Sequence, residues 1–284
     1  MSYFKMTLAM IIFASGSIFF EGIGLPPAIV AAVRAIVGMA LVAVVLGFSR
    51  SRSGFAGFKK NAFSIIFSGI ALAFNWIFLF SAYQRTGSSV VAVCYGVAPV
   101  LVLITAPLFL REKVTLLNVA CTLGAFAGTV LVSGIFAGKY PDLLGVMYAL
   151  IAAALYCAVI ILNKNIGNIT CLDNAFYQFV VAAVTSVVYA IFTAKNVSFA
   201  VSSQTVWKLL IISVLHTGIA YSLMYSAMKK MSAQNWGIMS YIEPLAAAVI
   251  AYFILERNLN HIQMLGAFLI LGFVLIAGFV KRRR

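Results

Sequence analysis

The sequence has few charged residues and very few side chains suited to acid–base chemistry or metal binding. Of its 284 residues only 9% are charged, and they include six acidic residues; there are two histidines. A soluble domain carries about 25% charged residues, so this chain has too little polar surface to fold in water. A His-Glu-x-x-His pattern and a Gly-x-x-x-x-Gly-Lys-Ser/Thr loop are both missing. The first absence weighs against a membrane enzyme, and the second excludes a self-contained ATP-driven pump.

The four cysteines have no paired spacing typical of a metal site: Cys94, Cys121, Cys157 and Cys171. At least three lie in apolar stretches, and we interpret them as small packing residues. We therefore expect no metal and no cofactor. The apolar start of the chain lacks a clear small-residue cleavage site, so we expect it to be a first membrane span rather than a leader peptide.

Hydrophobic residues make up 64% of the chain, and they form continuous apolar stretches along its whole length. A membrane-spanning helix needs about 20 such residues. The runs do not alternate with polar residues, which excludes a transmembrane barrel. The fold class predicted is therefore all-α integral membrane, with ten transmembrane helices. The predicted spans are 5–22, 27–48, 61–83, 88–110, 115–136, 142–163, 172–194, 206–228, 233–255 and 261–280.

The basic residues predict the orientation of these spans. Counted on alternate sides, 14 Lys and Arg residues fall on the side of both chain ends and five on the other. The tail alone contributes Lys281, Arg282, Arg283 and Arg284. Cytoplasmic loops are enriched in Lys and Arg, so we expect a bacterial inner-membrane protein with both termini on the cytoplasmic side. Because the basic residues lie in short loops, the net charge of +14 describes topology and predicts no nucleic-acid partner.

An internal repeat becomes visible when the sequence is shifted by 145 residues. The aligned identities are Ser81-Ala82 with Ser226-Ala227, Pro99 with Pro244, Ala106 with Ala251, and Leu110 with Leu255. Each half, 1–138 and 139–284, then holds five spans. Because five is odd, the two halves must be inverted relative to each other in the membrane. Inverted repeats are typical of transporters whose binding site lies at the repeat interface.

The sequence resembles the EamA-type branch of the drug/metabolite transporter superfamily over essentially its entire length. The motifs that carry the resemblance are residues 75–83 (NWIFLFSAY), Ala98-Pro99, 109–115 (FLREKVT), 218–222 (GIAYS) and 240–244 (SYIEP). The resemblance implies ten helices in two inverted five-helix repeats, a central cavity and alternating access. It also implies that the fifth and tenth spans lie at the periphery. Related sequences often carry a carboxylate where this chain has Ser81, which leaves Glu243 without that partner.

Glu243 is the sharpest candidate for a functional residue. It lies near the middle of the ninth span, where an ionised group costs roughly 2.5–3.5 kcal/mol. Such a group must face a wet cavity, pair with another group or take up a proton, so Glu243 is a candidate for proton coupling or for binding a cationic amine. The alternative is a structural hydrogen bond to a neighbouring helix. Pro99 and Pro244 stand at matching points of the two halves, where each frees a backbone carbonyl and kinks its helix.

Further side chains are predicted to line the cavity because they share helix faces near these prolines. The candidates are Asn75, Trp76, Tyr83, Tyr95, Tyr221, Tyr225, Asn235, Met239 and Ser240. Their aromatic character suits a small amphipathic solute, although aromatics also serve as packing and interface anchors. Arg34, a charge inside the second span, either pairs with Glu21, binds an anionic substrate group or extends toward the membrane surface. Gly124 and Gly128 permit a close helix approach.

These features predict a secondary transporter of a small metabolite, an amino acid or a related amphipathic solute, and we expect it to work as an exporter. The expected partners are that solute, the lipid bilayer and protons. The protein is expected to be a monomer or a homodimer. The alternatives are a polytopic membrane enzyme, a multidrug or nucleotide-metabolite carrier, and a channel. A channel would usually repeat in parallel around a pore, whereas inverted halves favour rocking.

Overall fold

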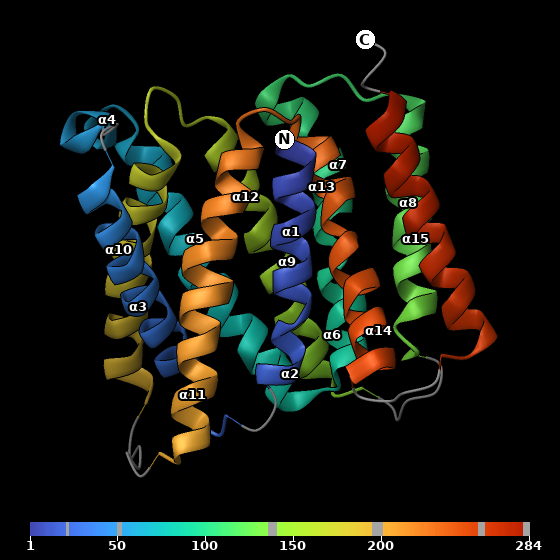
Figure 1. The fold of residues 1–284 in the computed structure, drawn as a ribbon, viewed down its shortest axis with the longest axis horizontal. Helices are drawn as coiled ribbons and strands as arrows, with labels where there is room; N and C mark the ends of the chain where they lie inside the picture. Colours follow the sequence, from blue (N-terminus) through green and yellow to red (C-terminus); the bar gives the residue numbers. More distant parts are fainter. Residues whose placement is uncertain (21–22, 50–52, 136–140, 195–200, 255–258, 281–284) are drawn as a thin grey trace.

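The computed structural model describes every residue except 21–22, 50–52, 136–140, 195–200, 255–258 and 281–284. All regular elements in the described part of the chain are helices, and they run roughly side by side (Figure 1). The elements of the first half are α1 (Ser2–Ala14), α2 (Gly16–Phe20), α3 (Pro27–Phe48), α4 (Gly54–Lys60), α5 (Ala62–Arg85), α6 (Ser88–Tyr95), α7 (Ala98–Leu110) and α8 (Leu116–Val132). Those of the second half are α9 (Leu143–Lys164), α10 (Cys171–Thr193), α11 (Ser203–Ile211), the π-helix η2 (Ile212–Ile219), α12 (Ala220–Met228), α13 (Ala233–Ser240), α14 (Ile242–Ile254) and α15 (His261–Val280).

Nine helical segments of the described chain are long and apolar enough to cross a membrane. The remaining apolar helix, α8, has 17 residues. Large apolar side chains such as Phe109, Phe192 and Phe253 are exposed on the outside of the bundle. A surface of this kind is stable against lipid and not against water, so the prediction of an all-helical, multi-pass membrane protein is confirmed.

Two of the predicted spans are interrupted beside their prolines. α6 ends at Tyr95, and α7 starts at Ala98 with Pro99 in its first turn. In the second half α13 ends at Ser240, and α14 starts at Ile242 with Pro244 close behind. Proline is tolerated in a first helical turn because its missing N–H is not needed there. Each break therefore turns the chain just before a proline.

The eighth predicted span is also irregular, because the π-helix η2 lies between α11 and α12. π-helical turns are rare and often mark functional sites. η2 packs against α3, where Gly38 makes the approach possible. A Cβ atom at Gly38 would lie 2.6 Å from the Cγ2 atom of Thr217, so a larger residue would push the two helices apart.

α8 and α15 lie side by side at one edge of the bundle (Figure 1). Their contact depends on glycine, as the spacing of Gly124 and Gly128 predicts. A Cβ atom at Gly128 would lie 2.8 Å from the carbonyl oxygen of Gly266, and one at Gly124 would overlap the ring of Phe273. The two backbones therefore touch directly, which is how small residues stabilise helix pairs in membranes.

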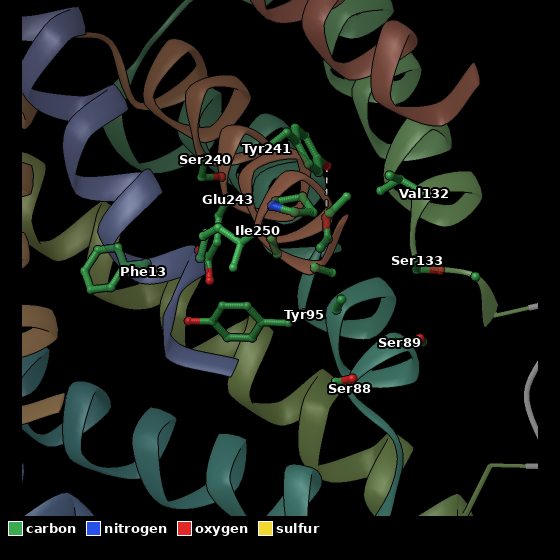
Figure 2. A pocket seen from close by; sticks show the side chains of 18 of the residues that line it. Phe13, Ser88, Ser89, Tyr95, Val132, Ser133, Ser240, Tyr241, Glu243 and Ile250 are labelled. Carbon is green, nitrogen blue, oxygen red and sulfur yellow. Dashed lines mark hydrogen bonds between the residues drawn. The ribbon is translucent and has the colours of Figure 1, made fainter. Parts of the chain in front are cut away.

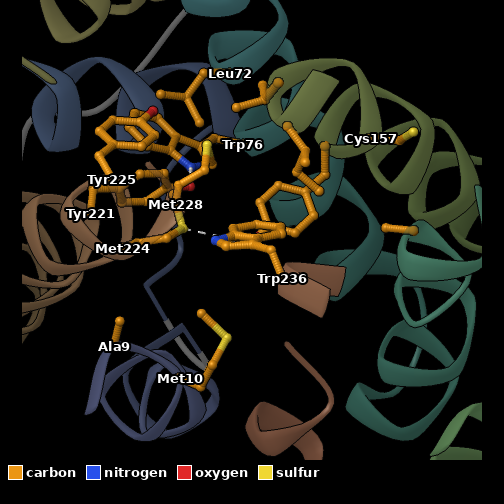
Figure 3. Packing of buried hydrophobic residues seen from close by; sticks show 14 of the residues in the cluster. Ala9, Met10, Leu72, Trp76, Cys157, Tyr221, Met224, Tyr225, Met228 and Trp236 are labelled. Atoms are coloured by element: carbon orange, nitrogen blue, oxygen red, sulfur yellow. Dashed lines mark hydrogen bonds between the residues drawn. The ribbon is translucent and has the colours of Figure 1, made fainter. Parts of the chain in front are cut away.

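α1 begins and α15 ends at the same end of the bundle, which we call the terminal end (Figure 1). At the opposite end, the far end, lie α2 and the beginning of α6. The interior between them is filled by a large cluster of buried apolar side chains. Trp76, Tyr221, Tyr225 and Trp236 are among its largest members, with methionines packed between them (Figure 3).

Candidate functional site

A cavity of about 850 Å³ opens into the bundle from the far end. Its outer part is lined by helix ends, including Ser88 and Ser89 at the start of α6 and Asn260 just before α15. Its inner part reaches Tyr95, Tyr156 and the break between α13 and α14. Both halves of the chain contribute to the wall, so the cavity lies between them. A cavity of this size fits a small organic solute.

Glu243 lies on the wall of this cavity, in the first turn of α14 (Figure 2). Its side chain is half-buried. Among the residues that the structure describes, none forms a hydrogen bond or an ion pair with its carboxylate. The N-terminus of a helix carries a partial positive charge, which stabilises an acidic group in its first turn. The carboxylate is therefore placed to act on whatever occupies the cavity.

An aromatic wall faces Glu243. Tyr95 stacks on Tyr156 with ring centroids 5.3 Å apart, and Tyr156 packs on Trp236 at 5.5 Å. Asn75 holds this wall in place, since its Nδ2 donates to the Tyr95 hydroxyl at 3.2 Å and to the Ala152 carbonyl at 2.7 Å. Figure 2 shows the Tyr95 ring projecting into the same space as Glu243. The site thus offers one acidic group and broad apolar faces.

The structure divides the candidate residues into two groups. Those that line the cavity are Tyr83, Tyr95, Pro99, Ser240, Glu243 and Pro244. Those that do not are Asn75, Trp76, Tyr221, Tyr225, Asn235 and Met239. Because α13 ends at Ser240, Asn235 and Met239 lie on a different helix from Glu243 and do not share one continuous face with it.

The second group has contacts elsewhere in the bundle. Trp76 donates from Nε1 to the Tyr221 hydroxyl at 2.9 Å. Tyr225 donates to Oε1 of Gln178 at 2.8 Å, in a buried cluster of amide side chains. The Nδ2 atom of Asn235 donates to the hydroxyl of Tyr3 at 3.4 Å, and Met239 is buried.

Several residues of the site were not expected from the sequence. Tyr241 lines the cavity and donates its hydroxyl hydrogen to the Gly96 carbonyl at 2.9 Å. The two residues are 145 positions apart, so the repeat itself signals this pair. Tyr156 and Phe20 also line the cavity, and no local pattern in the sequence distinguishes them from ordinary packing aromatics.

Arg34 is buried in α3, close to the cavity. Its Nε atom donates to the hydroxyl of Thr217 on η2 at 2.8 Å. Its guanidinium carbon lies 4.3 Å from the ring centroid of Trp76 and 5.4 Å from that of Phe80. The predicted alternative of a pair with Glu21 falls on a residue outside the described part of the chain.

The terminal end is bridged by hydrogen bonds between the two halves. The Glu112 carboxylate, in the segment between α7 and α8, accepts the backbone N–H of Ala233 at 2.7 Å and of Gln234 at 3.3 Å. Nδ2 of Asn118 donates to Oε1 of Gln234 at 2.5 Å. The ammonium group of Lys5 donates to the hydroxyl of Ser226 at 2.8 Å. A carboxylate at a helix N-terminus is a favourable arrangement, so these contacts hold the terminal end together.

At the far end an exposed ion pair joins α5 to the start of α9. Arg85 donates to the carboxylate of Asp142 at 2.9 Å. This hydrogen bond holds the pKa of the Asp142 carboxyl below its usual range. Within the described residues, no group of three His, Cys, Asp or Glu side chains is arranged to hold a metal ion.

The comparisons with known proteins agree with this architecture. The EamA-like transporter family model matches residues 1–134 and again residues 143–279. The uncharacterized transporter YxxF of Bacillus subtilis (strain 168) is 30% identical over 254 residues, which cover 87% of this chain and 79% of that protein. The uncharacterized transporter YyaM of the same organism is 27% identical over 233 residues, covering 79% of this chain and 75% of that protein.

One solved crystal structure superposes on this chain with a TM-score of 0.83, covering 99% of this chain and 98% of its own. At 19% sequence identity this likeness shows the fold alone. The family assignment comes from the two matched segments, which together span most of the chain. The chain belongs to the EamA-like transporter family of the drug/metabolite transporter superfamily, and it is a multi-pass membrane transporter.

Proposed function

We propose that this protein is a secondary carrier that moves a small amphipathic solute, an amino acid or a related metabolite, by alternating access. The observation that carries the proposal is the cavity of about 850 Å³ between the two halves, with Glu243 on its wall. A solute bound there would contact both halves at once. Rocking of the halves would then expose it to one side of the membrane or the other.

The proposal includes ten transmembrane helices arranged as two inverted five-helix repeats, 1–138 and 139–284. Two contacts support this symmetry. Trp76 bonds to Tyr221, and Gly96 bonds to Tyr241, and in each pair the partners are 145 residues apart. Equivalent residues of two related units meet only near the axis that relates the units. The two separate matches to the family model also support a division into two repeats.

We further propose export from the cytoplasm of a bacterial cell. The excess of Lys and Arg favours a cytoplasmic position for the terminal end, so the cavity would open away from the cytoplasm. The conformation described here would then be the one that releases solute outside. The contacts of Glu112 with Ala233 and Gln234 would keep the cytoplasmic side closed in that conformation.

Glu243 is proposed to bind a cationic amine of the solute and to exchange it for a proton. An acidic group in the membrane interior is costly when charged. An ammonium group bound to the carboxylate compensates its charge, and a proton bound to it neutralises that charge, so each removes the cost. Competition of the two for one carboxylate would couple the movement of the solute to the movement of protons.

Counterflow in proteoliposomes tests the proposed function. The purified full-length protein is reconstituted into vesicles loaded with one unlabelled amino acid or nucleoside from a broad panel, and uptake of the same labelled solute is followed. Transient, saturable accumulation above that in protein-free vesicles is expected for at least one solute. Uptake that does not saturate and shows no trans-stimulation would indicate a channel. Absence of counterflow across the panel, with folded protein, would contradict transport of this solute class.

A further inference from the structure

Arg34 is a buried cation whose hydrogen-bonding capacity is mostly unused within the described structure. Its side chain is 3% exposed. A guanidinium group has five N–H donors. The Nε–H donates to Thr217, and among the described residues none accepts a hydrogen bond from the other four donors or forms an ion pair with Arg34. The Nη atoms of Arg34 are not among the fully buried polar atoms that lack a hydrogen-bond partner, so they retain some accessible surface on which an additional acceptor can bind.

The surroundings of Arg34 stabilise its charge without satisfying those donors. The ring centroids of Trp76, Phe80 and Phe20 lie 4.3, 5.4 and 5.9 Å from its guanidinium carbon. Aromatic faces attract a cation through their quadrupoles. The N–H donors, however, point outward in the plane of the guanidinium group and need an oxygen acceptor there. A carboxylate fits this fork, because its two oxygens accept two parallel N–H bonds.

The packing of η2 on α3 positions the Arg34 side chain. Thr217 and His216 are adjacent on η2, and the Nε2 atom of His216 lies 3.0 Å from the hydroxyl oxygen of Ser15. Gly38, one turn after Arg34 on α3, lets η2 approach closely enough for the bond from Arg34 to Thr217. The π-helix and the glycine thus fix the guanidinium group rather than leaving it free to reach the membrane surface.

Phe20 lies near both Arg34 and the cavity. Phe20 lines the cavity and also lies 5.9 Å from the guanidinium carbon of Arg34. Glu243 lies on the wall of the same cavity. For one solute to contact both Arg34 and Glu243, the Phe20 ring must move aside.

We propose that Arg34 is a binding site for the carboxylate of the transported solute, whose amine binds to Glu243. This inference rests on the proposed function and narrows its substrate class to small solutes with a carboxylate and an amine on an apolar or aromatic body. In this arrangement the carboxylate supplies the in-plane acceptor that Arg34 lacks. The aromatic rings that surround Arg34 and line the cavity contact the apolar body of the solute.

Paired probes that differ only in the carboxylate test this assignment. Phenylalanine, leucine and methionine are each compared with their C-terminal amides, which keep the amine and the side chain. Binding to the purified full-length protein is measured by isothermal titration calorimetry. Removing one partner of a buried, hydrogen-bonded charge pair costs about 2–5 kcal/mol, so we expect wild-type protein to prefer at least one acid over its amide by about 30-fold or more. Arg34→Gln should reduce that ratio to near one.

Glu243→Gln is the matched control, because it should weaken an acid and its amide alike and leave their ratio unchanged. Arg34→Lys keeps the charge but loses the planar fork, so it should lower the ratio by about tenfold; it also serves if Arg34→Gln does not fold. A wild-type protein that prefers no acid over its amide overturns the assignment. So does a folded Arg34→Gln or Arg34→Lys protein that keeps the wild-type ratio.

Glu21→Gln separates a ligand site from an internal ion pair. If Arg34 pairs with Glu21, this variant should destabilise the fold as much as Arg34→Gln does. The acid-to-amide ratio should then change in neither variant, and the assignment fails.

Counterflow distinguishes failure of the carboxylate site from failure of the proposed function. Saturable counterflow of phenethylamine that is unaffected by Arg34→Gln, without preference for any acid, leaves the carrier standing and removes the carboxylate site. Selective binding of an acid without counterflow would support the carboxylate site and contradict the proposed carrier function.

Discussion

The indole N–H of Trp76 donates a hydrogen bond to the hydroxyl of Tyr221 at 2.9 Å, and the two residues are 145 positions apart in the chain. The same interval separates Tyr241 from Gly96, whose carbonyl accepts the Tyr241 hydroxyl hydrogen. Residues that a sequence shift aligns are therefore in contact with each other in the folded protein. Trp76 and Tyr221 are buried, and Gly96 and Tyr241 line the cavity.

Tyr221→Phe should destabilise the protein by about 1–3 kcal/mol, because it leaves the buried Trp76 N–H without an acceptor. The midpoint of thermal unfolding in detergent, followed by size-exclusion chromatography of heated samples, measures this effect. Tyr252→Phe is the control, since Tyr252 is exposed on α14, and it should leave the midpoint unchanged. Equal midpoints for both variants would show that the Trp76–Tyr221 bond contributes nothing to stability.

Glu243→Gln should abolish the pH dependence of solute flux while preserving the fold, because the amide cannot take up or release a proton. Flux is measured in proteoliposomes with an imposed pH gradient, using the solute identified by counterflow. Asp142→Asn is the control, because Asp142 is an exposed carboxylate outside the cavity lining, and flux through this variant should follow the pH gradient as in wild type. Flux through Glu243→Gln that still follows the pH gradient as in wild type rules out proton coupling at this residue.

Glu112→Ala should loosen the terminal end by removing the acceptor of two backbone N–H groups of α13. A carboxylate at a helix N-terminus contributes about 0.3–2 kcal/mol. We therefore expect hydrogen exchange in a peptide covering Ala233–Ser240 to accelerate by up to about 30-fold. Lys113→Ala is the control, because Lys113 contributes its backbone carbonyl to Gln234, and exchange should stay at the wild-type rate. Unchanged exchange in Glu112→Ala would mean that other contacts close this end.

Gly266→Ala should separate α15 from α8 and destabilise the protein by about 1–3 kcal/mol, the usual cost of overpacking. A Cβ atom at Gly266 would lie 2.6 Å from the Gly128 carbonyl oxygen, and backbone atoms cannot move aside cheaply. Gly272→Ala on the same helix is the control, since nothing lies within 4 Å of its added Cβ. That change should be neutral or stabilising, as alanine favours helices. The unfolding midpoint of Gly266→Ala should be lower than that of Gly272→Ala, and the reverse order would contradict the prediction.

Much of the fold could be predicted from the sequence, because apolar length and polar breaks are physical requirements of a bilayer. The predicted span 27–48 coincides with α3, and the span 88–110 coincides with α6 and α7 together. The π-helix at 212–219 was not predicted, because no pattern in its apolar sequence distinguishes it from an α-helix; in the structure it packs closely on Gly38 of α3.

The site was predictable only in part. Glu243 and the prolines stand out because charge and helix breaks are rare and costly in lipid. The sequence did not show which aromatic residues line the cavity and which pack in the core. Tyr95 lines the cavity and Tyr225 does not, yet both are tyrosines at similar positions within apolar helices. Which of them faces open space depends on how helices far apart in the sequence pack together.

The shortness of α8 makes one edge of the molecule sensitive to membrane thickness. Its 17 residues extend about 26 Å at 1.5 Å per residue, less than the roughly 30 Å of a typical hydrocarbon core. α8 is fixed to α15 by direct backbone contact, so it cannot adjust its height independently of its partner. Local thinning of the bilayer is one way in which a membrane accommodates such a short span. Transport should therefore be faster in bilayers with shorter acyl chains, and lipid length becomes a variable that sets the activity of this protein.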